Sequence, residues 1–187
     1  MKSFLKKNWG NLLLLIIIVI LFIPQTGMPI KVLLNRYLAF SPSEIPLEKQ
    51  EVISDYHWPL ENLNGNELNL TVSTGKVILI NSWATWCPPC VAELPSLQNL
   101  YDAYGDRVDF YFISSENPAT LRRFMDTKGY DLPVYVSGLQ TPDALISNSI
   151  PTTYVISKSG KIVMHKTGAA RWDSDNVTEL LEELLLE

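Results

Sequence analysis

The chain has 187 residues, of which 47% are hydrophobic and 19% charged, a composition that is typical of a packed globular protein and excludes a disordered chain. Its length suits one ordinary domain with an additional segment. The formal net charge is −5, yet residues 1–43 carry only basic charges, so the rest of the chain is strongly acidic. Such an acidic body argues against nucleic-acid binding, which needs a basic surface.

An apolar segment lies close to the N-terminus. All residues from Leu12 to Ile23 are strongly apolar, and no charged residue occurs between Trp9 and Ile30. The apolar core is short for a transmembrane helix, which needs about 20 residues, and it has the length of a signal-peptide core. A cleaved signal peptide therefore stays an alternative. The charge-free continuation to Ile30, with no small-residue cleavage site soon after the core, favours an uncleaved signal anchor over residues 1–30.

Basic residues before this segment predict its orientation. Lys2, Lys6 and Lys7 hold the N-terminus inside the cell by the positive-inside rule, so the body lies outside the cytoplasm under either alternative. Residues 31–55 are expected to form a polar connector, in which Lys31 to Phe40 predict a short amphipathic helix on the membrane surface. Residues 56–187 form the predicted folded domain.

Alternating strand and helix patterns occupy that domain. Two short strands are expected around Asn64-Gly65, a strong hairpin dipeptide. Further along the chain, the patterns predict strands at 76–83, 108–114, 152–157 and 161–167, an extended segment at 132–137, and helices at 88–104, 117–128 and 173–186. This order predicts an α/β fold with a central mixed sheet and helices on both of its faces.

Both cysteines lie in the stretch NSWATWCPPCVAELP, residues 81–95. A disulfide that closes so short a loop removes little chain entropy and stabilises weakly, so the pair is poorly explained as a structural link. Cys87 is placed where a strand ends and a helix begins, and the N–H groups of a helix N-terminus stabilise a thiolate. Pro88 suits the first helical turn. Cys87 is therefore the predicted attacking thiol, and Cys90 the thiol that resolves a mixed disulfide.

The sequence WCPPC after an apolar strand, followed by ELP, resembles the thioredoxin superfamily, and more closely its membrane-anchored, exported thiol-disulfide oxidoreductases of the TlpA/ResA type. The resemblance covers about residues 56–187 and includes the position of the anchor. It implies a thioredoxin fold with an extra N-terminal β-hairpin. It also implies a single-pass protein of a bacterial cytoplasmic membrane, with its N-terminus inside and its domain in the periplasm or outside the membrane.

The resemblance assigns a role to one acidic residue. Glu93 falls where several members of the family keep a buried carboxylate beneath the cysteines. Buried there, it would have a raised pKa and could exchange a proton with the Cys90 thiol near neutral pH. Asn81 occupies the position at which cytoplasmic thioredoxins place a buried aspartate, so the usual buried base is missing.

A second set of residues is implied to contact the substrate. The segment SIPTTYVIS is similar to the loop whose proline is cis and packs against the disulfide, which makes Pro151 the expected cis-proline. The backbone of Ile150 and Thr152 would then line a groove for a partner's extended chain, with Trp86 and Pro88 as further groove surface.

The leading hypothesis is an enzyme, a protein disulfide reductase that needs no cofactor other than its own Cys87–Cys90 pair. The resemblance implies partner proteins with cysteines, such as apocytochrome c before haem attachment, and a transmembrane thiol electron donor. A monomer is expected. The same residues allow a disulfide-donating oxidase, and also a Cu(I) or zinc-binding module, because thiolates suit these ions. A closed zinc site needs four ligands, however, and only His57 and His165 remain as nitrogen donors. The last alternative is a module that binds thiol proteins without turnover.

Overall fold

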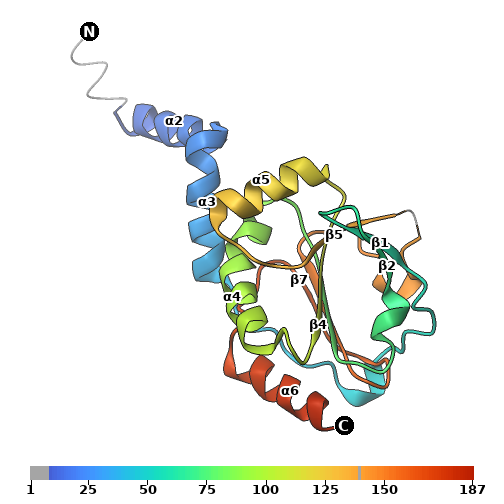
Figure 1. The fold of residues 1–187 in the computed structure, drawn as a ribbon. Helices are drawn as coiled ribbons and strands as arrows, with labels where there is room; N and C mark the ends of the chain where they lie inside the picture. The colour runs from blue at the N-terminus through green and yellow to red at the C-terminus, as the bar shows by residue number, and fades with distance from the viewer. Residues whose placement is uncertain (1–8, 139) are drawn as a thin grey trace.

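The computed structural model describes residues 9–138 and 140–187, and Figure 1 shows an α/β body from which the N-terminal helix α2 projects. Its sheet has seven strands in the order β2-β1-β5-β4-β3-β6-β7. The strands are β1 (Pro59–Asn62), β2 (Glu67–Asn69), β3 (Ile78–Ser82), β4 (Asp109–Ser114), β5 (Val134–Ser137), β6 (Thr152–Ile156) and β7 (Ile162–Thr167). Strand β4 is parallel to both β3 and β5, whereas the other neighbouring pairs are antiparallel. The predicted mixed sheet is therefore confirmed.

The helices are α2 (Trp9–Phe22), α3 (Pro24–Leu38), α4 (Pro88–Tyr104), α5 (Pro118–Lys128) and α6 (Asp175–Leu186), with 3₁₀ turns η1 (Leu47–Lys49), η2 (Leu70–Ser73) and η3 (Asp143–Leu145). The three helices of the folded domain, α4 to α6, begin and end close to the positions that the sequence predicts. Helix α5 starts where the Asn117 side chain accepts a hydrogen bond from the Ala119 N–H, and it ends at Gly129, whose φ of 71° lies in the left-handed region.

The prediction of helices on both faces of the sheet is wrong for the α-helices. Buried side chains of α4, α5 and α6 all join one apolar core together with the same face of the strands. The opposite face packs against residues of η2 and η3 and against Ile53 and Trp58. Since β3, β4 and β5 lie in consecutive order, two right-handed crossovers in the same direction place α4 and α5 on the same face. In Figure 1, these helices lie on one side of the strands.

The apolar segment predicted to continue from Trp9 to Ile30 is divided into two helices. Ile23 has an extended conformation, with φ −75° and ψ 121°, between the end of α2 and Pro24 at the start of α3. A proline disfavours the helical conformation of the residue before it and has no N–H to continue the helix, which explains the break. Over the described residues, no helix combines the length and the apolar character that crossing a membrane requires.

The segment that follows α3 lies along the folded domain. The boundary predicted between residues 30 and 31 falls inside α3, which packs against α4. Beyond it, Phe40 forms a bridge with Ala170, and further bridges join Glu44 to Met164 and Val52 to Lys161. Residues 39–55 are therefore held to β7 and to the loops before and after it.

Candidate active site

The disulfide lies at the junction of a buried strand and a helix. Strand β3 is apolar and buried at residues 78–80, because it has neighbours on both sides and cores on both faces. It ends at Ser82, and Cys87 is the N-cap of α4, with Pro88 in the first turn, where the missing N–H of proline has no effect on the helix. The sequence therefore presents Cys87 at the carboxyl end of β3, as predicted.

Cys87 and Cys90 are joined by a disulfide with a Cα–Cα distance of 5.3 Å. The Cys90 N–H donates a hydrogen bond to Cys87 Sγ at 3.3 Å. After reduction, this donor and the helix N-terminus would stabilise a thiolate on Cys87. Both residues are largely buried, with Cys87 3% exposed and Cys90 fully enclosed, so only the Cys87 side of the pair reaches the surface.

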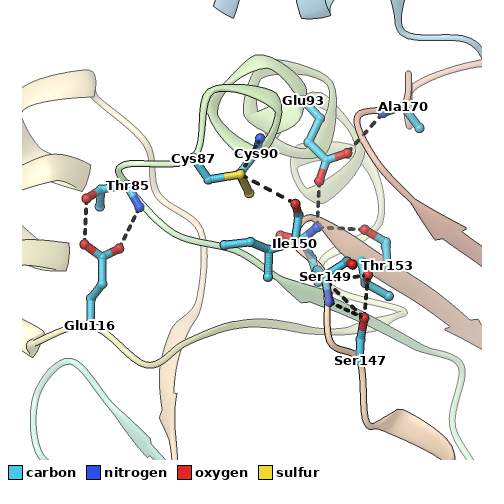
Figure 2. Close-up of a disulfide and its surroundings, with 12 residues drawn as sticks. Thr85, Cys87, Cys90, Glu93, Glu116, Ser147, Ser149, Ile150, Thr153 and Ala170 are labelled. Atoms are coloured by element: carbon cyan, nitrogen blue, oxygen red, sulfur yellow. Dashed lines mark hydrogen bonds between the residues drawn. A yellow bond between two sulfur atoms is a disulfide. The ribbon is translucent and has the colours of Figure 1, made fainter. Parts of the chain in front are cut away.

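The loop before β6 closes over the disulfide. The Ile150–Pro151 peptide bond is cis, which confirms that prediction. Cys87 Sγ lies 3.8 Å from the carbonyl oxygen of Ile150, and Figure 2 shows this oxygen directed toward the sulfur atoms. Thr152 is fully buried, and its hydroxyl contacts the Ser149 carbonyl oxygen at 2.8 Å and Ser147 Oγ at 2.9 Å. The hydroxyl of Thr152 therefore supports the loop.

A groove beside the disulfide has a volume of about 250 Å³. Trp86, Trp83 and Ile150 line it, and Trp86 is 66% exposed. Pro88, Pro151 and Thr152, which were also predicted as groove surface, are not among its lining residues. The described side chains around the groove are apolar or carry hydroxyl groups, and none of them is charged.

Glu93 is buried in α4 with 1% of its surface exposed, as the resemblance implies. Its Oε1 accepts a hydrogen bond from Asn81 Nδ2 at 2.8 Å, and its Oε2 accepts from the Ala170 N–H at 3.1 Å and from Trp172 Nε1 at 3.0 Å. Burial raises the pKa of Glu93 from its usual 4.5 to about 7, although the three hydrogen bonds lower it in part. None of the three donors is charged, so burial prevails and Glu93 can gain or lose a proton near neutral pH.

Several residues of this site were not found from the sequence. Glu116 accepts hydrogen bonds from the Thr85 N–H at 2.6 Å and from Thr85 Oγ1 at 2.8 Å, and so fixes the loop that carries Trp86. Trp172 and Ala170, which hold Glu93, follow β7 at the far end of the chain. Glu116 could have been found from the sequence as a polar residue shortly after a buried strand. No sequence pattern indicates that Trp172 contacts Glu93.

The structure also places the two histidines. His57 Nδ1 lies 3.0 Å from Asn69 Nδ2, and His165 stacks on Tyr154. In the described part of the chain, no group of three or more His, Cys, Asp or Glu side chains gathers as a metal site would require. The donor set therefore gives the metal-binding alternative no support.

The Redoxin family model matches residues 49–183, which is most of the chain. The chain belongs to the Redoxin family. It is 36% identical over 112 residues to the thiol-disulfide oxidoreductase ResA of Halalkalibacterium halodurans, a match that spans 58% of this chain and 64% of that protein, less than two thirds of its length. It is 30% identical over 150 residues to the thioredoxin-like protein YneN of Bacillus subtilis, covering 78% of this chain and 84% of YneN.

A solved structure supports the fold. A putative thiol:disulfide interchange protein DsbE from Chlorobium tepidum aligns with a TM-score of 0.61 at 21% identity, over 75% of this chain and 99% of that one. The resemblance to ResA-like proteins of the thioredoxin superfamily is thus confirmed, and so is the thioredoxin-like fold. ResA is a thiol-disulfide oxidoreductase, which agrees with the predicted enzyme class.

Glu93→Gln is expected to change how stability depends on pH. Between about pH 4.5 and 7 the folded protein keeps a proton on Glu93 that the unfolded chain has lost. This proton therefore makes its full contribution to the free energy of unfolding below about pH 4.5. The contribution is lost as the pH rises through about 7, and the loss is on the order of 3 kcal/mol. Urea unfolding of the oxidised protein at about pH 5 and about pH 8.5 should show this loss in the native chain and not in Glu93→Gln.

The exposed substitution Glu183→Gln, in α6, serves as the control and should follow the native chain. An identical pH dependence in the native chain and in Glu93→Gln would contradict the assignment of this proton to Glu93.

Proposed function

We propose that the protein is a thiol-disulfide oxidoreductase that reduces disulfides of partner proteins. The observation that carries this proposal is the Cys87–Cys90 disulfide at the N-terminus of α4, next to the cis Ile150–Pro151 bond and to a buried carboxyl group. These features supply an attacking sulfur, a neighbouring resolving sulfur and a group that accepts a proton.

The proposed reaction transfers two electrons in two steps. The Cys87 thiolate attacks a partner disulfide, forming a Cys87–partner bond and releasing the first partner sulfur as a thiolate. Cys90 then gives its proton to the Glu93 carboxylate, and its sulfur attacks Cys87. The Cys87–Cys90 bond forms, the second partner sulfur leaves, and the two released thiolates take up protons from Glu93 and from water. The partner is reduced and the Cys87–Cys90 pair is oxidised.

The groove indicates how a partner would bind. It borders Trp86 and Ile150, and the Ile150 carbonyl oxygen lies close to the sulfur that attacks. An extended partner chain can use this backbone through hydrogen bonds that do not depend on its sequence. Because the groove has no charged side chain, it suits neutral segments of unfolded proteins. Apocytochrome c is the substrate class that we propose from the family resemblance.

The protein is further proposed to work outside the cytoplasm, where a reductase must be recharged by a transmembrane thiol donor. It would reach the membrane through α2, whose apolar side chains include Trp9, Leu13, Leu14 and Ile17, all exposed. The exclusively basic charge of residues 1–43 favours contact with an anionic lipid surface.

Alkylation of the reduced protein tests the roles of the two cysteines. Iodoacetamide near neutral pH should label Cys87 about 10-fold faster than Cys90 or more, because the helix N-terminus favours the Cys87 thiolate and Cys90 is enclosed. Peptide mass analysis over time gives both rates. Cys90→Ser should in addition accumulate a mixed disulfide with a protein substrate, whereas Cys87→Ser should form none. Equal labelling rates would remove the assignment.

The reduction potential decides the direction of exchange. Equilibration of the full chain against dithiol/disulfide buffers should give a value near or below the ~ −270 mV of thioredoxin, as expected for a reductant. A value approaching ~ −120 mV would instead identify a disulfide donor of the same fold, and the proposal of apocytochrome c reduction would fall.

Flotation with lipid vesicles tests the role of α2. The full chain should float with vesicles of phosphatidylglycerol and phosphatidylcholine, and high salt should not release it, because apolar contact persists when charges are screened. A variant with serine at Leu13, Leu14, Ile17 and Ile18 should stay in the aqueous fraction. Equal flotation of this variant would show that α2 is not the site of attachment.

A further inference from the structure

Asn81 lies under the active site in the middle of the sheet. Its backbone is held between Phe112 of β4 and Thr153 of β6, and its side chain is fully buried. Nδ2 donates hydrogen bonds to Glu93 Oε1 at 2.8 Å and to Thr153 Oγ1 at 2.7 Å, whereas Oδ1 has no partner. Both amide hydrogens are therefore used, and a buried acceptor is left unsatisfied, which costs free energy and calls for a reason.

The partners of Glu93 determine which oxygen can carry its proton. Oε2 accepts from the Ala170 N–H and from Trp172 Nε1, and these two groups can only donate. A proton on Oε2 would face the hydrogens of both donors and find no acceptor, so the proton belongs on Oε1. Figure 2 shows one oxygen of Glu93 bonded toward Ala170 and the other directed toward the strands below α4.

A protonated Oε1 needs an acceptor, and only one atom of the Asn81 amide can provide it. Rotating the amide by half a turn brings Oδ1 to the position of Nδ2, where it can accept from Glu93 Oε1–H and from the Thr153 hydroxyl. A threonine hydroxyl can donate as readily as it accepts. Each orientation then satisfies Glu93 and Thr153 equally and leaves one amide atom without a partner, so neither is disfavoured by its hydrogen-bond count.

We infer that Asn81 is a positioning residue whose side-chain amide rotates by half a turn when Glu93 gains or loses its proton. Nδ2 faces the ionised carboxylate, and Oδ1 faces the protonated acid. The Thr153 hydroxyl changes from acceptor to donor in the same rotation. The amide thus keeps Glu93 hydrogen-bonded in both protonation states. An ionised aspartate at this position could only accept, and two carboxyl groups would then share one proton.

The consequence for catalysis rests on the proposed function, in which Glu93 takes the proton of Cys90. The raised pKa of Glu93 allows this exchange near neutral pH. The ionisable side chains that line the cavity beside Ala170 are Arg36, Tyr37, Arg171 and Asp173, and all four are solvent-exposed. Strands β3 and β6 contribute Asn81 and Thr153, which do not ionise. The amide therefore responds to Glu93 itself.

Nuclear magnetic resonance of the oxidised, ¹⁵N-labelled full chain tests the inference, because the disulfide removes thiol titration from the measurement. Ionised Glu93 should hold one Nδ2 hydrogen of Asn81 and Thr153 the other. As the pH falls through the midpoint of Glu93, both hydrogens should lose their partners and shift upfield together. A fixed amide would change at the Glu93-facing hydrogen alone, and that result, or no inflection at the Glu93 midpoint, would overturn the inference.

Two substitutions serve as a matched pair for this titration. Glu93→Gln should abolish the inflection of the Asn81 signals, whereas Glu116→Gln, which changes the other carboxyl group of the site, should leave it in place. Asn81→Asp should raise the midpoint of the shared proton by about one pH unit or more, since two adjacent carboxyl groups titrate as a coupled pair.

The test separates the inference from the proposed function. If both hydrogens shift with Glu93 but the reduced protein does not exchange disulfides with protein substrates, the proposed function fails and the assignment of Asn81 stands. If exchange proceeds and the amide does not respond to Glu93, the inference about Asn81 fails alone.

Discussion

The burial of one carboxyl group among uncharged hydrogen-bond donors is the constraint on which this active site depends. Glu93 projects from α4, and its donors come from β3 and from the loop after β7, so segments far apart in the sequence must meet around it. An isolated buried carboxylate would cost many kcal/mol, and the three donors reduce this cost without providing a compensating charge. The remaining cost raises the pKa of Glu93, and a raised pKa is the property that the proposed disulfide exchange needs next to Cys90.

The chain that precedes the folded domain contacts the residues that hydrogen-bond to Glu93. The Arg171 N–H donates to the Phe40 carbonyl oxygen at 3.2 Å, and Phe40 also forms a bridge with Ala170, whose N–H holds Glu93. Helix α3 packs against α4, the helix that carries the acid. The residues after α3 therefore do more than connect: they pair with the backbone segment that donates to the carboxyl group.

The sequence predicted well what local patterns determine. The spacing of apolar residues gave α4 with both of its ends, and the position of Cys87 at its start follows from the strand before it and Pro88 after it. The cis bond before Pro151 and the burial of Glu93 came from the family resemblance, since base rates favour a trans proline and an exposed acid. Local sequence patterns do not determine the order of the strands in the sheet. This explains why the prediction of helices on both faces of the sheet was wrong. Trp172 is 79 residues from Glu93, so their contact depends on the completed fold.

The position of Glu93 also bears on the direction of electron flow. It follows Cys90 by three residues on the same helix, and residues at this spacing lie on the same side. A strongly oxidising dithiol owes its potential to a stabilised thiolate in the reduced form, as helix N–H groups provide. A buried carboxylate opposes this, because its negative charge disfavours a thiolate nearby and so favours the disulfide. The N-terminus of α4 and Glu93 would thus act on the Cys87–Cys90 pair in opposite senses, and an acid that is ionised above about pH 7 supports the proposal of a reductant.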